Sequence, residues 1–140
     1  MQNPSNNNPA ADLGKFILRA ALAILILFHG IAKIMHGIDP IIGMIARTGL
    51  PPAIAYLVYI GEVAAPALVL AGIWTRPAAL VIAINMAVAV LLAHTSQFFT
   101  LTGTGGWALE LQGMYFISAL TVALLGAGRI SIGGAAGKWN

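Results

Sequence analysis

The sequence predicts an all-α membrane protein, a bundle of four transmembrane helices with both termini in the cytoplasm. Hydrophobic residues make up 59% of the 140 residues and charged residues only 8%, whereas roughly a quarter of the residues in a soluble domain are charged. The apolar residues gather into four segments of about twenty residues, the length that crosses a bilayer core as a helix. A water-exposed globular fold is therefore excluded, and the length leaves room for one domain.

The four apolar segments are separated by turn and loop signals. They span residues 16–35, 53–74, 77–99 and 107–127. Pro52 and Pro77 stand at predicted helix starts, where a missing backbone N–H costs little. The strings 49–52 and 74–77 are therefore predicted turns, and the Gly- and Thr-rich residues 100–106 form a predicted loop.

Polar stretches flank the predicted bundle, which we place at residues 13–132. Residues 1–12 are rich in Asn and Pro with almost no apolar bulk, so we expect a flexible tail, and residues 133–140 form a short second tail. A cleaved signal peptide is the alternative for the first segment, since Lys15 and Arg19 precede an apolar run. The long polar stretch before that run favours a retained span.

The placement of Lys and Arg predicts the orientation of the bundle. With four spans, the N-terminal region, the second turn and the C-terminal tail share one side, which carries Lys15, Arg19, Arg76, Arg129 and Lys138. The other side holds only Lys33 and Arg47. Because cytoplasmic loops carry the excess of Lys and Arg, both termini are predicted to be cytoplasmic.

Composition also excludes several classes of function. The net charge is +3, but the basic residues are scattered singly, so the chain has no basic patch for nucleic acid. Cysteine is absent, which excludes disulfides, thiolate metal sites and thiol relays within this chain. A redox role would therefore use a bound cofactor, a quinone or a partner protein.

Ionisable side chains inside the apolar segments are the main clue to function. In the predicted topology His29, Lys33, Glu62, His94 and Glu110 all fall in the outer half of the membrane, on four different helices. A charge near the centre of a span costs about 2.5–3.5 kcal/mol on insertion scales. Glu62 therefore needs a partner, and Lys33 is the predicted one. Such a pair is a functional site by default, although a buried ion pair can also serve helix packing alone.

The surroundings of Glu62 favour a binding site. Pro66 cannot donate a hydrogen bond to the Glu62 carbonyl, so the helix is predicted to kink there and leave that oxygen free. Gly61 removes bulk and would allow a close neighbour. The alternative is a kink that is merely tolerated, since spanning helices often contain proline.

The remaining polar residues extend this candidate site. His29 is predicted to hydrogen-bond a ligand or relay protons, or else to bond a carbonyl of the next helix. Asn85 is predicted to form an interhelical hydrogen bond, and we group it with His94 and Glu110 as candidate ligand contacts. A haem between His29 and His94 is a less favoured alternative to a quinone, and no metal site is predicted.

Several stretches of the chain resemble the DoxX family, over about residues 13–132. The matching pieces are Phe-His-Gly-Ile-Ala-Lys (28–33), Gly-Glu (61–62), Leu-Ala-Gly-Ile-Trp-Thr-Arg-Pro (70–77), Glu-Leu-Gln-Gly-Met-Tyr (110–115) and Gly-Ala-Gly-Arg-Ile-Ser (126–131). The resemblance implies a four-span protein of the bacterial inner membrane. It also implies an association with thiosulfate:quinone oxidoreductase or with membrane oxidoreductase complexes that answer oxidative stress.

Together these observations favour a small subunit of a membrane oxidoreductase system, with an outward-facing polar pocket for a quinone or a small substrate. In this hypothesis Glu62 accepts a proton, Lys33 sets its charge state and His29 binds the ligand. The expected partners are the lipid bilayer, other membrane or peripheral oxidoreductase subunits and further copies of the chain. The alternatives are a non-catalytic assembly subunit and, less favoured, an oligomeric transporter.

Overall fold

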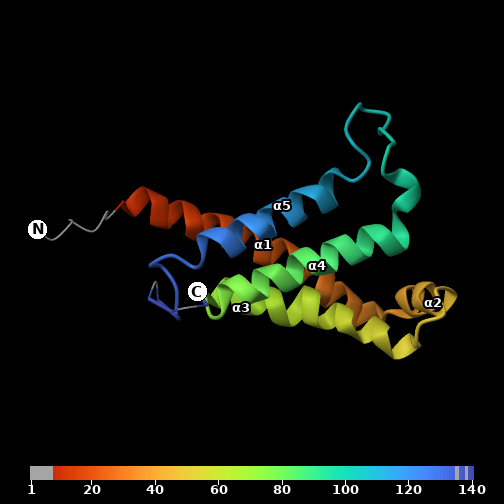
Figure 1. The fold of residues 1–140 in the computed structure, drawn as a ribbon, viewed down its shortest axis with the longest axis horizontal. Helices are drawn as coiled ribbons and strands as arrows, with labels where there is room; N and C mark the ends of the chain where they lie inside the picture. Colours follow the sequence, from red (N-terminus) through yellow and green to blue (C-terminus); the bar gives the residue numbers. More distant parts are fainter. Residues whose placement is uncertain (1–7, 135, 138) are drawn as a thin grey trace, which may run out of the picture.

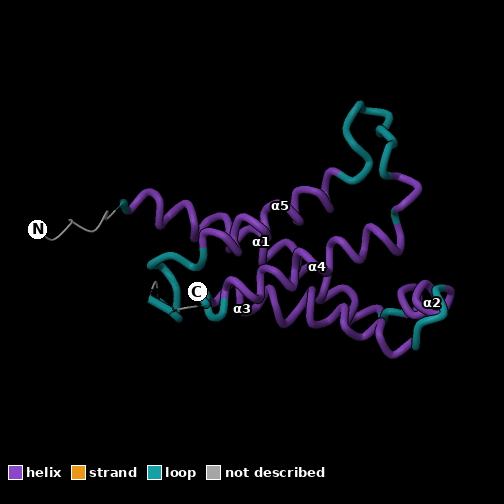
Figure 2. Tube along the Cα trace, viewed as in Figure 1, coloured by secondary structure: helices purple, strands orange, loops and turns teal. Residues whose placement is uncertain are grey.

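The computed structural model describes residues 8–134, 136–137 and 139–140, and in this part of the chain every regular element is a helix (Figures 1 and 2). The elements in chain order are α1 (Pro9–His36), α2 (Asp39–Arg47), the 3₁₀ helix η1 (Pro52–Leu57), the π-helix η2 (Ile60–Ala64), α3 (Ala65–Ala71), α4 (Thr75–Ala93), the 3₁₀ helix η3 (Thr95–Gln97) and α5 (Glu110–Leu125). The prediction of an all-α fold is confirmed.

Among the residues that the structure describes, three helical stretches are long and apolar enough to cross a membrane, namely α1, the continuous run Pro52–Ala71 and α4. The fourth apolar helix, α5, has 16 residues, which span about 24 Å against a hydrocarbon core of about 30 Å. The protein is therefore an integral membrane protein, and its described part holds three membrane-length apolar helices and one shorter apolar helix.

The first helix begins earlier than the sequence predicts. The Asn8 side chain accepts hydrogen bonds from the backbone N–H groups of Ala10 (3.1 Å) and Ala11 (3.3 Å), and Pro9 occupies the first turn. Asparagine as N-cap followed by proline is a strong helix start. Residues 9–12, which we predicted as part of the tail, are therefore helical, with Asn8 as the N-cap, and residues 1–7 lie outside the described residues.

One helix was not predicted at all. The outer loop between the first two segments contains α2, nine residues with Asp39 in the first turn and Arg47 in the last. These charges suit the helix dipole. The helix buries Ile45 against Ala55 of η1, with Leu92 of α4 packed beside them. The element was overlooked because it is too short to span a membrane.

The third and fourth helices are shorter than predicted. Backbone of helical conformation in α4 ends before His94, which has φ −132° and ψ 14°, so the expected segment to residue 99 stops six residues early. At the other side of the loop, α5 begins at Glu110 rather than at Trp107. The Trp107 indole N–H donates to the Phe98 carbonyl (2.8 Å) and holds the connecting loop closed on itself.

The helices form a bundle with two different ends (Figure 1). The start of α1 and the C-terminal segment lie at one end, whereas α2 and the loop between α4 and α5 lie at the other. A backbone hydrogen bond from Arg129 to the Asp12 carboxylate (3.4 Å) joins the two terminal regions. The core between the ends is rich in alanine and aliphatic residues, including Leu22, Ala23, Ile26, Ala65, Val69, Ala79, Ile82, Ala83 and Val122.

A buried arginine ties the terminal end together. Arg19 of α1 is only 1% exposed, and its guanidinium donates to the carbonyl oxygens of Val69 (2.8 Å) and Leu70 (2.9 Å) near the end of α3 and to that of Ile130. Helix ends leave carbonyls without intrahelical partners. We read Arg19 from the sequence only as a topology signal, and the structure shows that it also connects α1, α3 and the C-terminal segment.

Candidate functional site

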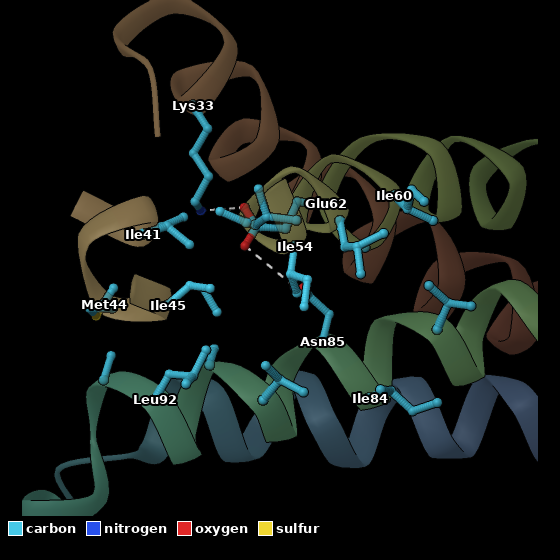
Figure 3. Close-up of a pocket in the computed structure, with 18 of the residues that line it drawn as sticks. Lys33, Ile41, Met44, Ile45, Ile54, Ile60, Glu62, Ile84, Asn85 and Leu92 are labelled. Atoms are coloured by element: carbon cyan, nitrogen blue, oxygen red, sulfur yellow. Dashed lines mark hydrogen bonds and ion pairs between the residues drawn. The ribbon is translucent and has the colours of Figure 1, made fainter. Parts of the chain in front are cut away.

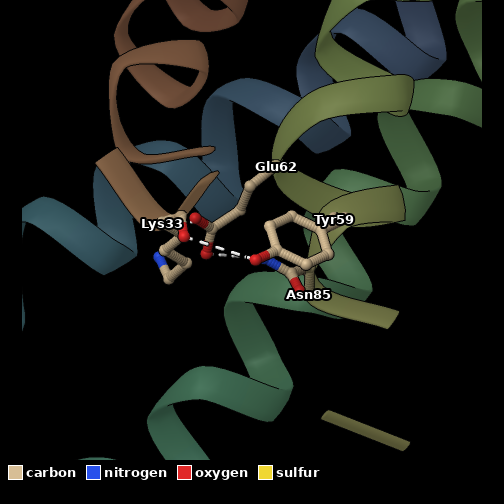
Figure 4. Close-up of polar contacts among 4 residues, drawn as sticks. All are labelled: Lys33, Tyr59, Glu62 and Asn85. Carbon is tan, nitrogen blue, oxygen red and sulfur yellow. Dashed lines mark hydrogen bonds and ion pairs between the residues drawn. The ribbon is translucent and has the colours of Figure 1, made fainter. Parts of the chain in front are cut away.

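An ion pair between Lys33 and Glu62 forms the centre of the candidate site (Figure 4). Lys33 lies one turn before the end of α1, and Glu62 lies in the middle of the π-helix η2. Glu62 is only 6% exposed, so its carboxylate depends on partners within the protein. The predicted pairing of these two residues is confirmed.

Two further side chains complete the polar group. The Asn85 amide of α4 donates to the second carboxylate oxygen of Glu62 (3.4 Å), and the Tyr59 hydroxyl donates to the Lys33 backbone carbonyl (3.3 Å). Figure 4 shows these four residues converging from three elements. The predicted interhelical role of Asn85 is confirmed, and its partner is Glu62.

The backbone around Glu62 departs from α-helical geometry. The N–H of Ala65 reaches back to the carbonyl of Ile60, five residues earlier, which defines the π-helix. Pro66 follows and cannot donate to the Glu62 carbonyl. The predicted disturbance at Glu62 is present, as a π-helical turn, and such turns are frequent at functional sites.

Two glycines allow the helices to approach at this level. A Cβ on Gly30 of α1 would lie 2.2 Å from the Glu62 carbonyl oxygen, and a Cβ on Gly61 would lie 2.5 Å from the Asn85 side chain. The carbonyl that Pro66 leaves without its helical donor therefore packs against α1, whereas we expected it to be free for water, a ligand or a side chain. Gly61 provides the close approach that we predicted for it.

A cavity of about 530 Å³ lies on one side of the ion pair. Figure 3 shows Lys33, Glu62 and Asn85 at its polar wall, with aliphatic side chains of α2, the Pro52–Ala71 run and α4 around the rest. These apolar lining residues include Ile41, Met44, Ile45, Ile54, Ile84 and Leu92. The cavity volume is within the range of about 300–1,000 Å³ that is usual for small-molecule sites.

The rim of this larger cavity faces the membrane. Leu57, Ile60, Ile84 and Val88 line the cavity, yet they are between 44% and 63% exposed. These residues belong to membrane-length helices, so their exposed surface meets lipid. A lipid-soluble ligand could therefore enter sideways from the bilayer.

A smaller cavity of about 190 Å³ lies on the other side of the ion pair. Its lining is more polar and comes from α1, η2, α4, the residue after α4 and α5. The polar lining residues are His29, Lys33, Glu62, His94, Gln112 and Tyr115. Lys33, Glu62, Ala89 and His94 line both cavities, so the ion pair stands between them.

The predicted site residues are brought together with one exception. Lys33, Glu62 and His94 line both cavities, Asn85 lines the larger one, and His29 lines the smaller one, where its ring meets Tyr115 edge to face at 6.1 Å. Glu110 is exposed at the start of α5, beside Gly106, and lines neither cavity. The helix begins at Glu110 itself and turns Gln112 and Tyr115 to the smaller cavity, so Glu110 is outside the group.

Three polar residues of the site were missed by the sequence reasoning. Tyr59 was not among the site residues predicted from the sequence, although its position three residues before Glu62 places both on one helical face. Gln112 and Tyr115 were seen only as part of a resembling stretch, although a glutamine within an apolar span was a usable signal. Among the described residues, no three His, Asp or Glu side chains gather as metal ligands.

Comparison with known proteins places the chain in a family. The model of the DoxX family matches residues 14–95, which covers more than half of the chain and includes most of α1 and all of α2, the Pro52–Ala71 run and α4. The resembling stretches at 110–115 and 126–131 lie outside the matched part. Searches of curated proteins and of solved structures found no match. The chain belongs to the DoxX family.

Proposed function

We propose that this protein is a small subunit of a membrane oxidoreductase system and that it binds a quinone, or a similar amphiphilic carbonyl compound, in the larger cavity. It would span the inner membrane of a bacterium four times, with both termini in the cytoplasm. The single observation that carries this proposal is the combination of a lipid-facing aliphatic cavity of about 530 Å³ with a buried ammonium–carboxylate pair in its wall.

The lining of the larger cavity suits such a ligand. A quinone ring is apolar on its faces and carries carbonyl oxygens that accept hydrogen bonds. Lys33 and the Asn85 amide supply donors at one wall, while Ile41, Ile54 and Leu92 supply aliphatic surface. A mostly apolar cavity with a few convergent polar groups is the usual form of a small-molecule site.

The residues of the polar wall would have distinct roles. Lys33 would turn an ammonium N–H toward a ligand carbonyl, and Glu62 would exchange a proton with the ligand. Asn85 would keep the Glu62 carboxylate in place. His94, which lines the larger cavity, is better placed for the ligand contact that the sequence suggested for His29.

A bound quinone would supply two-electron chemistry, and the electrons would come from or go to a partner redox subunit. This chain has no cysteine, so its own residues would bind, orient and move protons. The family resemblance implies a relation to membrane oxidoreductase complexes. That relation supports an arrangement in which a partner subunit carries the electrons and this chain binds the ligand and moves protons.

Quinone binding can be tested directly on the purified protein in nanodiscs. A short-chain quinone analogue should bind the native chain, and Lys33→Met or Glu62→Gln should weaken binding about tenfold or more, as expected from one lost charge-assisted hydrogen bond. Lys15→Met, which removes a charge at the other end of α1, serves as the control and should bind normally. Equal binding by all four proteins, or none by the native chain, would reject the proposal.

A scaffold role is the second candidate, and the close packing around the ion pair favours it. Gly30 and Gly61 bring three helices together at the level of Glu62, so the pair could serve only to fix helix register. In that case Lys33→Met combined with Glu62→Met should keep assembly with partner subunits and their activity. Quinone binding by the native chain that disappears in this double variant, together with lost activity, would count against a purely structural role.

A further inference from the structure

The two cavities on either side of the Lys33–Glu62 pair differ in character. The larger cavity is mostly aliphatic and meets lipid, whereas the smaller one presents two histidines, a glutamine and a tyrosine. With about 190 Å³ and several polar partners, the smaller cavity is polar and roomy enough for several waters. Water in it would contact the same carboxylate that faces the larger cavity.

We propose that the smaller cavity is an aqueous inlet through which Glu62 exchanges protons with the water phase at the α2 end of the bundle, with His94 as the relaying base. The inference deepens the proposed function and rests on it, because a proton route matters only if Glu62 serves a ligand. It gives the smaller cavity a role in proton transfer, which quinone binding alone does not require.

The position of His94 suits a relay. Its ring nitrogen Nδ1 lies 3.2 Å from the Gln97 side-chain oxygen, and a hydrogen bond donated by Nδ1 to that oxygen leaves Nε2 free to accept a proton. The residue caps α4, is half-buried and lines both cavities. Histidine takes up and releases protons near neutral pH, which makes it the usual shuttle.

Other titratable side chains lie near Glu62 or near its partner Lys33. Those that line a cavity with it or contact its partner are Lys33 and His29 of α1, Tyr59 before η2, His94 after α4 and Tyr115 of α5. Lys33 is held as the ion partner and Tyr59 is hydrogen-bonded to the Lys33 carbonyl. His29 is exposed at the edge of the smaller cavity and would act at its mouth.

The proton route can be written for reduction of the ligand. Two electrons come from the partner redox subunit, and two protons come from the water phase outside the bundle, one after the other. Each proton is passed along the cavity waters to His94 Nε2, through water to the Glu62 carboxylate, and from the Glu62 O–H to a ligand oxygen, so the cavity waters remain neutral. Glu62 is then again a carboxylate paired with Lys33, ready for the next proton.

Water in the smaller cavity can be tested with single cysteines, because the native chain has none. Tyr115 lines the cavity, whereas its neighbour Met114 is 62% exposed on the lipid side of the same helix. A charged methanethiosulfonate reagent added to reconstituted vesicles should modify Tyr115→Cys about tenfold faster or more than Met114→Cys, since the reactive thiolate forms only where water solvates it. Gln112→Cys is the second cavity position if Tyr115→Cys does not fold. Equal or slower modification of the cavity positions would overturn the inlet, whether or not a quinone binds.

The relay is tested by measuring proton uptake on ligand binding. When a ligand carbonyl binds the Lys33 ammonium, Glu62 loses its ion partner and should take up a proton. Stopped-flow mixing with the quinone analogue and a pH indicator should show proton uptake that is several-fold slower in His94→Gln and is restored by imidazole in the buffer. Unchanged uptake in His94→Gln would overturn the role of His94. A reactive Tyr115→Cys together with no quinone binding by the native chain would instead support the aqueous cavity and reject the proposed function.

Discussion

Glu62 illustrates how a single residue organises this protein. A carboxylate within an apolar span costs several kcal/mol unless it is paired, and here Lys33 and Asn85 share its two oxygens. The approach of α1 to the Glu62 backbone depends on Gly30, because no larger residue fits there. The packing of α1 against the Glu62 backbone therefore depends on the absence of a side chain at Gly30.

We predict that Gly30→Ala destabilises the protein, because its Cβ would lie 2.2 Å from a backbone oxygen that cannot rotate away. Overpacking of this kind costs about 1–3 kcal/mol. The loss should appear as a lower midpoint of unfolding in mixed micelles. Gly14→Ala on the same helix meets nothing within 4 Å and should be neutral or slightly stabilising; a Gly30→Ala protein as stable as Gly14→Ala would refute the packing argument.

At the scale of elements, the arginine of α1 acts as a clamp. Arg19 joins the end of α3 to the C-terminal segment through three carbonyl oxygens. The C-terminal segment is also bonded to the same turn through its backbone, from Ile132 to Ala71 (3.0 Å) and from Gly133 to Gly72 (3.1 Å). The end of the bundle that holds the termini is therefore fixed independently of the candidate site.

Arg19→Met should lower the free energy of unfolding by at least about 1.5–3 kcal/mol, the value of one hydrogen bond to a charged group. Arg129→Met is the matched control, since Arg129 is exposed at the same end and its loss changes the charge equally. The free energies of unfolding of both variants, measured in mixed micelles, are compared with that of the native protein. If both variants lost the same stability, a charge effect rather than the clamp would explain it.

The sequence predicted the elements that depend on local signals and missed those that depend on packing. The apolar runs, the helix start at Pro52 and the loop at 100–106 were predicted correctly. The turn predicted at 74–77 is wrong, because α4 already begins at Thr75 and the turn lies at 72–74. The early end of α4 at Ala93 was not predicted, because the apolar stretch continues beyond it. Likewise α2 is apolar but too short to be recognised as a span, and it is held in place by the packing of Ile45 on Ala55.

At the scale of the whole molecule, topology connects the site to the membrane. Both ends of the described chain lie at one end of the bundle (Figure 1). Lys33 lies in the last turn of α1, far along the helix from the N-terminus, and pairs there with Glu62. The meeting of Lys33 and Glu62 was predictable, since a buried charge demands a partner. The presence of two cavities, and the exclusion of Glu110, depended on side-chain packing and on where α5 begins.

The predicted orientation can be measured with the same cysteine-free background. Ala11→Cys, Thr102→Cys and Ala136→Cys are all at exposed positions. The excess of Lys and Arg at the terminal end predicts that a membrane-impermeant maleimide labels Thr102→Cys on intact cells and the other two only after permeabilisation. Labelling of Ala11→Cys or Ala136→Cys from outside would show that the bundle is inverted or that its ends are separated.

The central claim is that the larger cavity beside Glu62 holds the ligand, and a photoreactive quinone analogue tests it most directly. After illumination in nanodiscs and peptide mapping, the label should lie on residues 41–58 and 84–94. It should be displaced by excess quinone and be lost in Glu62→Gln. Label confined to the lipid-facing side of α5, or label that neither excess quinone nor Glu62→Gln removes, would contradict the account.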